Sequence, residues 1–403
     1  MAALVRNIGL TASISTKGAG LKLGNSASLT RIYNRSVVLD ALRRNESLSR
    51  IELARLSGLT PQAIRVIVGD LMEEGLVQQL GRRKGLPGQP QIEITINPNG
   101  GYALGFHIVD NWCHYLATNL AGEVIVDGGT IDLPENPSAL KPHLDRIDRQ
   151  AARAAGKSPR VGVGIAVSNL MAAGGLIEPH PENRAYTEHI QRHFGPDTFV
   201  ENDANAAAMA ETMFGRAKSR EDFIYLFIGD GVGGAIVRGG ELQRGHRGNA
   251  GEFGHIVVDP AGRICHCGNR GCLYTYLSTA ALKTKTKQTA ARDKSVREWL
   301  SKAIPALRSA VVSLENSFDP ERLIVGGTAP VELLKTLVAE LNPLGPSIRS
   351  DAPERVEVSE LGPTTALLGA AALPLLSLMS PSAAKLTKQS LSAATSGAGE
   401  PSC

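Results

Sequence analysis

Three cysteines and two histidines stand close together in the middle of the chain, in the segment GHIVVDPAGRICHCGNRGC. Imidazole nitrogens and thiolates bind Zn²⁺ tetrahedrally at about 2.0–2.3 Å, and four such ligands leave no coordination position open for a substrate. The chain has five cysteines, so three in one glycine-rich loop beside a histidine favour a metal site over a loop that merely holds reduced thiols. The spacing predicts a structural zinc site with four ligands, His255, Cys265, Cys267 and Cys272.

His266 is an alternative fourth ligand. Because it lies between two cysteine ligands, we expect its ring to point to the opposite side, which makes His255 the preferred ligand. If one ring nitrogen of His255 binds the metal, the other is available to donate a hydrogen bond to a small molecule. Such a contact would connect the zinc site to ligand recognition.

The same segment resembles the ROK family, which comprises repressors, open reading frames and sugar kinases. Residues 251–255 (GEFGH) are similar to the GExGH element of the family, and residues 265–272 (CHCGNRGC) are similar to its CxCGxxGC cluster. The resemblance extends from about Ile32 to Ala372. It implies an α/β fold of the actin and hexokinase (ribonuclease H-like) type with two subdomains, and a sugar site beside the zinc loop.

Several further residues match, or replace, the sugar-binding residues of the family. Residues 200–208 (VENDANAAA) resemble an element that ends a strand and opens a helix, where a polar residue acts as a helix cap or holds sugar hydroxyls, or does both. In the kinases the aspartate of this element takes the proton of the reacting hydroxyl. The expected sugar contacts are Asn202, Asp203, Glu252, His255, Ser168, Asn169 and Tyr274.

Two of these positions depart from the family pattern. Ser168 and Asn169 follow a glycine-rich apolar strand where the family has a proline-glycine pair. Tyr274 stands where the family has a glutamate that grips the sugar. Tyrosine donates one hydrogen bond or stacks on a sugar face, but it does not accept two hydroxyls, so we expect either a different sugar or weaker binding.

The nucleotide site is expected to be defective. In the kinases the first hairpin carries a DxGGT element that approaches the phosphates, and here the aligned residues are His107, Val109, Asp110 and Asn111. A neutral imidazole replaces the carboxylate, branched or polar side chains replace the glycines, and Asp110 is expected to emerge beyond the hairpin turn. The loop at residues 229–234 (GDGVGG) is able to cradle phosphate through backbone N–H groups, but Asp230 repels it. We therefore expect no kinase activity.

The amino-terminal part reads as a set of short helices. Apolar residues recur at helical spacing over residues 32–44. Ser49 and Glu52 have the spacing of a capping box at the start of a second helix. Thr60 caps a third helix that has Pro61 at its first position, where the missing N–H costs no hydrogen bond. This order, with a glycine turn between the last two helices, predicts a helix-turn-helix.

Two strands, at residues 76–79 and 91–96, complete a winged version of this motif. A helical dimerisation module with a basic loop is the alternative interpretation. Gln62 and Arg65 lie on the exposed side of the third helix, where glutamine pairs with adenine and arginine with guanine. Cations on the wing neutralise phosphates or enter the minor groove. The expected DNA contacts are Gln62, Ala63, Arg65, Arg82, Arg83 and Lys84.

Composition limits the class of protein. The chain has 403 residues, 42% hydrophobic and 20% charged, with a net charge of +4. A membrane span needs an apolar run of about eighteen residues, and we recognise no such run in the sequence. We recognise no secretory signal either. Cysteines clustered as metal ligands indicate the reducing cytoplasm. Paired winged helices on a palindromic site make a homodimer the expected state.

The sequence therefore predicts four parts. Residues 1–30 form a flexible basic extension, residues 31–98 the DNA-binding domain, residues 99–379 the sensor domain and residues 380–403 a disordered tail. Within the sensor, the first subdomain covers about 99–203 plus 363–379, and the second about 204–362.

The predicted function is that of a sugar-responsive, DNA-binding transcriptional regulator, a repressor of carbohydrate genes, with an operator and a sugar or sugar phosphate as partners. One alternative is an ATP-dependent sugar kinase that carries a DNA-binding domain. Another is a sensor that has lost its ligand and responds to a protein partner.

Overall fold

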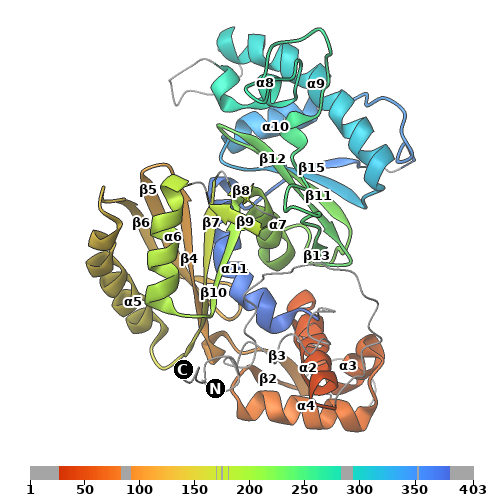
Figure 1. The fold of residues 1–403 in the computed structure, drawn as a ribbon. Coiled ribbons are helices and arrows are strands. Elements are labelled where there is room, and N and C mark those ends of the chain that lie inside the picture. The colour runs from red at the N-terminus through yellow and green to blue at the C-terminus, as the bar shows by residue number, and fades with distance from the viewer. Residues whose placement is uncertain are drawn as a thin grey trace, which may run out of the picture. The chain divides into compact units, whose positions relative to one another are not determined.

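The computed structural model describes residues 27–82, 92–168, 170–173, 176–179, 181–282, 294–351 and 354–381. The chain divides into two compact units (Figure 1). The first unit is formed by the described parts of residues 1–168, 179–200 and 370–403, and the second by those of residues 169–178 and 201–369. Each unit has a five-stranded sheet with helices packed on it.

The first unit begins with three helices, α2 (Ala27–Arg44), α3 (Arg50–Ser57) and α4 (Pro61–Glu73). The predicted caps are confirmed. The hydroxyl of Ser49 accepts from the N–H of Glu52 while the carboxylate of Glu52 accepts from the N–H of Ser49, and Thr60 accepts from the N–H of Ala63 at 3.2 Å. Gly58, with φ 67°, makes the left-handed turn between α3 and α4. Helix α2 begins earlier than Ile32, where its periodicity was expected to start.

A small sheet follows, made of β1 (Leu48–Ser49), β2 (Val77–Arg82) and β3 (Ile92–Ile96) in the order β1-β3-β2. The strands pair antiparallel, and a bulge lies between Gln79 and Gly81. Leu53 and the apolar stripe of α4 are buried beside this sheet. The predicted winged helix-turn-helix is confirmed.

The larger sheet of the first unit has the order β10-β7-β4-β5-β6. Its strands are β4 (Tyr102–Val109), β5 (Trp112–Asn119), β6 (Val124–Asp132), β7 (Arg160–Val167) and β10 (Thr198–Asn202). Strand β5 pairs antiparallel with β4 and β6, whereas β4 pairs parallel with β7, so the sheet is mixed. Helices α5 (Lys141–Ala155) and α6 (Pro181–Phe194) contact it.

The two faces of this sheet carry different partners. Phe106 of β4 packs on Phe194 of α6, with ring centroids 5.7 Å apart. Gly164 of β7 approaches the backbone of Ala370 so closely that a Cβ atom would lie 1.8 Å from its carbonyl oxygen. Phe106 pairs with Ile165 of β7, so the side chains of these two residues lie on the same face of the sheet. Gly164 is next to Ile165 in the strand, and neighbouring strand residues face opposite sides, so Gly164 faces the other side. Helix α6 and the carboxyl end of α11 (Thr365–Met379) therefore cover opposite faces.

The sheet of the second unit has the order β13-β12-β11-β14-β15. Its strands are β11 (Phe223–Ile228), β12 (Val232–Arg238), β13 (Glu241–Leu242), β14 (Arg322–Gly326) and β15 (Val356–Val358), and a separate two-stranded sheet pairs β8 (Leu170–Ala173) with β9 (Leu176–Pro179). The helices are α7 (Asp203–Phe214), α8 (Tyr274–Leu277), α9 (Lys294–Phe318) and α10 (Val331–Ala339), together with the start of α11. Alternate residues of β11 enter a core with α9 and α10.

Among the described residues, two prolines lie beyond the first turn of a helix. Helix α11 continues through Pro374 to Met379, and α9 continues through Pro305. From the sequence, Pro374 is expected to end or kink the helix that starts at Thr365, and the structure shows that the helix does not end there. Proline removes one backbone hydrogen bond, but Leu375 and Met379 are fully buried, and this packing offsets the loss.

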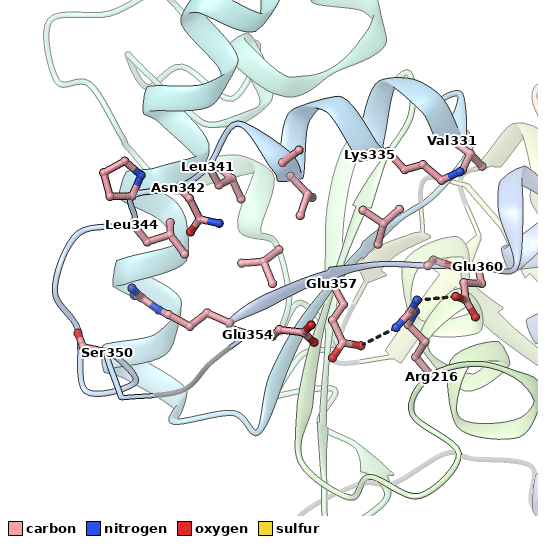
Figure 2. Close-up of a pocket in the computed structure, with 17 residues that line it drawn as sticks. Arg216, Val331, Lys335, Leu341, Asn342, Leu344, Ser350, Glu354, Glu357 and Glu360 are labelled. Atoms are coloured by element: carbon pink, nitrogen blue, oxygen red, sulfur yellow. Dashed lines mark hydrogen bonds and ion pairs between the residues drawn. The ribbon is translucent and has the colours of Figure 1, made fainter.

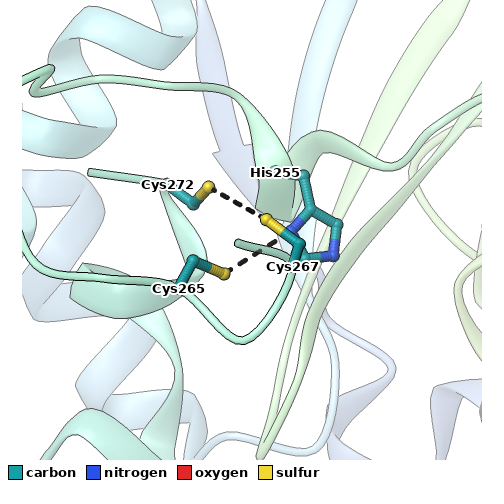
Figure 3. Close-up of side chains that lie close together, drawn as sticks. All are labelled: His255, Cys265, Cys267 and Cys272. Atoms are coloured by element: carbon teal, nitrogen blue, oxygen red, sulfur yellow. Dashed lines mark hydrogen bonds between the residues drawn. The ribbon is translucent and has the colours of Figure 1, made fainter. Parts of the chain in front are cut away.

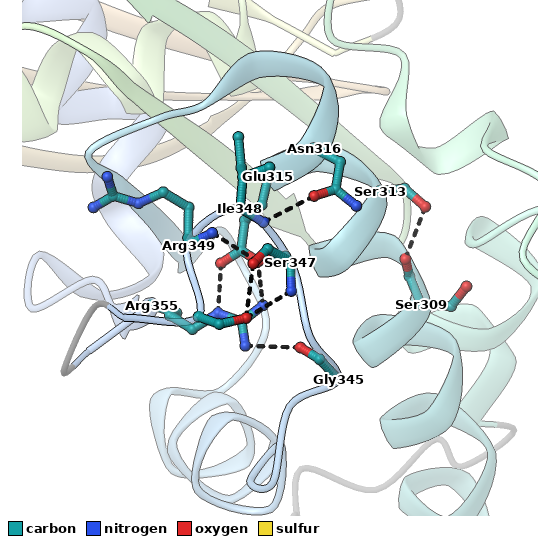
Figure 4. Close-up of polar contacts among 10 residues, drawn as sticks. Ser309, Ser313, Glu315, Asn316, Gly345, Ser347, Ile348, Arg349 and Arg355 are labelled. Carbon is teal, nitrogen blue, oxygen red and sulfur yellow. Dashed lines mark hydrogen bonds and ion pairs between the residues drawn. The ribbon is translucent and has the colours of Figure 1, made fainter.

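A buried ion pair holds the segment between α10 and β15 (Figure 4). The guanidinium of Arg355 donates to both carboxylate oxygens of Glu315, on α9, and also to the hydroxyl of Ser347 and the carbonyl of Gly345. The side chains of the pair are 9% and 2% exposed. Glu315 raises the pKa of the Arg355 guanidinium. Removing one partner alone would leave the other charge buried without compensation.

One stretch of the described residues, Gly362–Met379, is long and apolar enough to cross a membrane by length and composition alone. From the sequence we expected no such stretch. In the structure 61% of it is buried inside the protein, as in the core helix of a folded domain.

Candidate functional site

The four predicted metal ligands lie together (Figure 3). Their ligand atoms are all within 4.8 Å of one another. Nδ1 of His255 lies 3.7 Å from Sγ of Cys265, and Sγ of Cys267 lies 3.6 Å from Sγ of Cys272. Ligands at about 2.0–2.3 Å around a tetrahedral ion are separated by about 3.3–3.8 Å. The donor set and its spacing therefore fit a tetrahedral metal ion.

The thiols of this cluster differ in acidity. Hydrogen bonding to the backbone of Asn269 lowers the pKa of Cys267, which is exposed. Burial raises the pKa of Cys272 to about 12. Thiolate therefore forms at Cys267 before it forms at Cys272, and a metal ion that binds here has to displace the proton of Cys272.

The loop that carries the cluster is fixed by its backbone. Val257 and Cys272 form an antiparallel bridge, and the N–H of Cys265 donates to the carbonyl of Asn269 at 2.8 Å. Gly271 has φ 68°, and a Cβ atom there would lie 1.6 Å from the carbonyl oxygen of Asp259. Only glycine fits this position, so the glycine in the cluster motif has a steric cause.

His266 is not among the four residues whose ligand atoms lie within 4.8 Å of one another, which supports the preference for His255 as the fourth ligand. Its ring nevertheless lies near the cluster, with Nδ1 3.9 Å from Sγ of Cys265 and its ring centroid 5.2 Å from that of His255. The rings of His266 and Tyr274 are nearly perpendicular, at a centroid distance of 4.8 Å. His266 lies between His255 and Tyr274, a relation that the sequence did not indicate.

Asn202 and Asp203 stand where β10 ends and α7 begins. Asn202 is the N-cap, since its side chain accepts from the N–H of Asn205 at 2.6 Å, and Asp203 is the first helical residue. Sequence reasoning missed Glu201 beside them. Its buried carboxylate accepts from the amide of Asn205 at 2.9 Å and from Nε of Arg244 at 2.8 Å, so it ties this junction to the loop after β13.

The segment that carries the predicted sugar contacts Glu252 and His255 lies near β12. A Cβ atom on Gly233 would be 3.5 Å from the side chain of Ala204 in α7. A Cβ atom on Gly254, which lies between Glu252 and His255, would be 2.1 Å from the carbonyl oxygen of Val232. The α7 junction and the GExGH segment thus both pack on this strand. Glu252 is exposed, and His255 and Tyr274 are half-buried.

The predicted DNA contacts are only partly described. On α4, Gln62 and Arg65 are exposed and Ala63 is half-buried, whereas Ile64 and Ile67 are buried. The first two side chains are therefore accessible to a partner. Three predicted wing contacts, the side chain of Arg82 and the residues Arg83 and Lys84, lie outside the described residues, as does the predicted sugar contact Asn169. Ser168 is half-buried.

A cavity of about 780 Å³ in the second unit is lined by α10, β15 and the segment between them (Figure 2). On one side of it Arg216 pairs with Glu357 and Glu360. Glu357 also pairs with Arg220, at 3.0 Å, and with Arg322, at 2.8 Å. None of the predicted metal, sugar or DNA residues lines this cavity.

Sequence comparison identifies the family. The profile of the ROK family matches residues 133–375, and a profile of winged helix-turn-helix DNA-binding domains matches residues 34–78. This protein belongs to the ROK family. The resemblance noted from the motifs of the zinc loop is thus confirmed over more than half of the chain.

Individual ROK proteins are similar over most of the chain. The xylose repressor of Bacillus subtilis strain 168 is 28% identical over 356 residues, which cover 83% of this chain and 90% of the relative. The DNA-binding transcriptional dual regulator NagC of Escherichia coli K12 is 28% identical over 290 residues, 67% of this chain and 68% of the relative. A crystal structure of a ROK family transcriptional regulator, described as a homologue of the E. coli MLC protein, has the same fold, with 24% identity, a TM-score of 0.67 and coverage of 87% and 97%.

The residues expected to replace the phosphate element of the kinases lie on the β4-β5 hairpin. His107 is buried at 4% exposure, its ring meets Trp112 edge-on at 6.0 Å, and its Nε2 has no hydrogen-bond partner among the described residues. Burial lowers the pKa of His107 to about 4. The imidazole is therefore neutral at pH 7. Asp110, with φ 47°, lies in the turn between the two strands.

The glycines that resemble nucleotide-binding loops have contacts of their own. A Cβ atom on Gly229 would lie 2.3 Å from the hydroxyl of Thr328, and one on Gly327 would lie 2.4 Å from the carbonyl oxygen of Ile228. The ends of β11 and β14 thus approach closely, and backbone atoms leave no room for a side chain at Gly327. Asp230 accepts from the hydroxyl of Thr279 at 2.6 Å. Packing within the second unit accounts for Gly327 without a nucleotide, whereas a Cβ atom on Gly231 would meet no atom within 4 Å.

Proposed function

We propose that this protein is a transcriptional repressor that binds an operator through its winged helix-turn-helix and releases it in response to a sugar. One observation carries the proposal: a winged helix-turn-helix domain and a ROK domain occur in the same chain, and this chain aligns with 90% of the length of a xylose repressor. We assign DNA binding to residues 31–98 and sugar sensing to residues 99–379. Carbohydrate genes are the expected targets, and the cytoplasm is the expected location.

In this proposal α4 enters the major groove. Gln62 and Arg65 meet base edges and Ala63 contacts a thymine methyl group or the sugar-phosphate backbone. The wing supplies phosphate contacts through Arg82, Arg83 and Lys84, a list taken from the sequence alone. The exposure of Gln62 and Arg65 beside a buried stripe supports the assignment of this face. A homodimer on a palindromic site is the expected assembly.

The sugar site is assigned to Asn202, Asp203, Glu252, His255 and Tyr274, with Ser168 and Asn169 as further contacts. Support comes from the packing of the α7 junction and the GExGH segment on the same strand, β12. The side-chain oxygens of Asn202 and Asp203 accept from backbone N–H groups of α7 at 2.6 and 2.8 Å, and these hydrogen bonds fix both side chains at the junction. Neighbouring hydroxyls of a pyranose suit such a pair of adjacent, oriented polar residues.

We further propose that the bound ion is Zn²⁺ and that it is structural. Three thiolates and one imidazole leave no position for a substrate in a tetrahedral site. The ion would hold the loop of residues 255–272 and fix the orientation of His255, whose Nδ1 faces Cys265. The remaining nitrogen, Nε2, is then the donor to the sugar.

The sugar is not phosphorylated in this proposal. Phosphoryl transfer relies on positioning the phosphates and their Mg²⁺, and a carboxylate in the first hairpin serves that purpose in the kinases. His107 is buried and neutral, and Asp110 is held in the hairpin turn. The alternative function is that of an ATP-dependent sugar kinase with a DNA-binding domain. It requires that other residues position the phosphates and Mg²⁺ in place of the missing carboxylate.

The proposal is tested with the full-length protein and a DNA fragment chosen by genome-wide mapping of its bound sites. We expect one sugar or sugar phosphate to weaken operator binding by about 1–3 kcal/mol, a typical coupling free energy. Asp203→Ala and Glu252→Ala should abolish this response and keep operator affinity without sugar. Glu332→Ala, which removes an exposed carboxylate on α10, is the matched control and should respond like the wild type.

Three outcomes contradict the proposal in different ways. ATP-dependent phosphorylation of a sugar by the purified protein would establish the kinase. A response to a protein partner, with no sugar altering operator binding, would establish a sensor that has lost its ligand. Equal operator affinity of the wild type and Arg65→Ala, with Arg238→Ala as an exposed control cation on β12, would remove α4 from the DNA interface.

A further inference from the structure

The position of His266 raises the question of what its ring does beside the metal cluster. Two imidazoles lie at the same sulfur, since Nδ1 of His255 is 3.7 Å and Nδ1 of His266 is 3.9 Å from Sγ of Cys265. Ligands around a tetrahedral ion are separated by about 3.3–3.8 Å, so the distance from His255 falls in this range and the distance from His266 lies just above it. His266 is exposed, whereas His255 is half-buried.

We propose that His266 is a second histidine ligand of the metal, which takes the fourth coordination position whenever His255 leaves it. Only one imidazole binds at a time. His255 completes the set of four atoms within 4.8 Å, and His266 is not part of that set, so His255 is the resident ligand in this conformation. The exchange breaks one metal–nitrogen bond and forms another, with both imidazoles neutral, and the three thiolates stay bound.

The surroundings of His266 allow such an exchange. Its ring lies edge-on between the rings of His255, at 5.2 Å, and Tyr274, at 4.8 Å, and these aromatic contacts hold it near the cluster. Cys265 and Cys267, its neighbours in the chain, are both ligands, so the backbone that carries His266 is already fixed around the ion. The proposal requires that rotation of this exposed side chain bring its nitrogen to the metal.

The exchange has a consequence for the sensor, and this consequence rests on the proposed function. When His266 holds the metal, His255 is released to turn toward a ligand, and Tyr274 loses the ring that packs against its edge. A sugar that binds better to one of the two arrangements would shift the balance between them, and by no more than its difference in affinity.

The first test measures metal binding to the full-length protein without sugar or DNA, so that it does not depend on the proposed function. Co²⁺ replaces Zn²⁺ as the probe, because its absorption reports four-coordinate thiolate sites. We expect His255→Ala to keep one cobalt per chain with a four-coordinate spectrum. His255→Ala/His266→Ala should bind cobalt more weakly than His255→Ala, by roughly 10–100-fold, a range typical of losing one supporting group at a metal site. The control, His255→Ala/His246→Ala, removes an exposed histidine elsewhere in the same unit and should equal His255→Ala.

The second test keeps His255 in place and so avoids any folding defect of its variants. Zinc is withdrawn from the wild type, His266→Ala and His246→Ala by an excess of chelator, and its transfer is followed with time. Loss of the ion passes through a state in which His255 has left, and His266 recaptures the ion there, so His266→Ala should lose zinc several-fold faster than the other two. Equal transfer rates in all three proteins, or equal cobalt affinity of His255→Ala and His255→Ala/His266→Ala, would overturn the proposal.

Discussion

Replacing His107 by phenylalanine should make the protein less sensitive to acid. The pKa of His107 is lowered by burial to about 4, whereas in the unfolded chain it has the ordinary value of about 6.5. Below pH 6.5 the unfolded state takes up a proton that the folded state does not, so stability falls as the pH falls, and this loss ends near pH 4 where the folded state is protonated too. Over the full window the loss is about 3 kcal/mol, and between pH 6.5 and pH 5 it is about 2 kcal/mol, at about 1.4 kcal/mol per pH unit.

The measurement is the free energy of unfolding in denaturant at several pH values between 7.5 and 5, for the wild type and His107→Phe. Phenylalanine keeps an aromatic ring against Trp112 and does not titrate, and the contributions of other groups cancel in the difference between the two proteins. His246→Phe, at an exposed position, is the control and should follow the wild type. Parallel pH curves for the wild type and His107→Phe would refute the reasoning, because they would mean that the imidazole is able to ionise in the folded protein.

Two further predictions concern the second unit. Cys272→Ser should lower the metal content from about one ion per chain to near zero. At a metal concentration 100-fold above the dissociation constant, this loss should remove about 2.7 kcal/mol of stability. Cys113→Ser, which changes a buried cysteine outside the cluster, is the control and should keep the ion. Metal analysis and thermal unfolding check this, and a fully metallated Cys272→Ser protein would argue against the site. Arg355→Met should cost about 3–5 kcal/mol, because it leaves Glu315 buried and unpaired. Lys335→Met, which breaks the exposed ion pair with Glu332, should cost about 0–1 kcal/mol. The free energy of unfolding in denaturant is measured for both variants. Similar losses for both would mean that the buried ion pair contributes no more to stability than the exposed one.

Local signals predicted the amino-terminal motif well. Ser49 with Glu52, and Thr60 with Pro61, were recognised as helix starts because a cap is formed by residues within one turn of each other. Helices that begin at such cap residues were predicted to within a few residues of their observed bounds. Periodicity placed α2 late, at Ile32, since its first turn carries no apolar pattern that sequence alone reveals.

The ligand set of the metal site was also accessible from the sequence, because three thiols and an imidazole at short spacing are typical of a metal site. The residues that support the site were not. Glu201 fixes the α7 junction through Arg244, a residue far along the chain, and no local pattern connects the two. The exposed face of α4 follows from its amphipathic stripe, and the DNA contacts of α4 and of the wing both remain predictions from the sequence.

The sequence by itself determined the helix caps, the family motifs and the membership of the His/Cys cluster, since each depends on the types and spacing of residues close in the chain. Only the tertiary structure decided three other properties. It placed the ring of His266 beside the cluster, buried His107 so that its imidazole stays neutral, and kept α11 helical through Pro374. Each of these depends on which distant residues surround the group, and burial and packing by such residues outweigh the local preference.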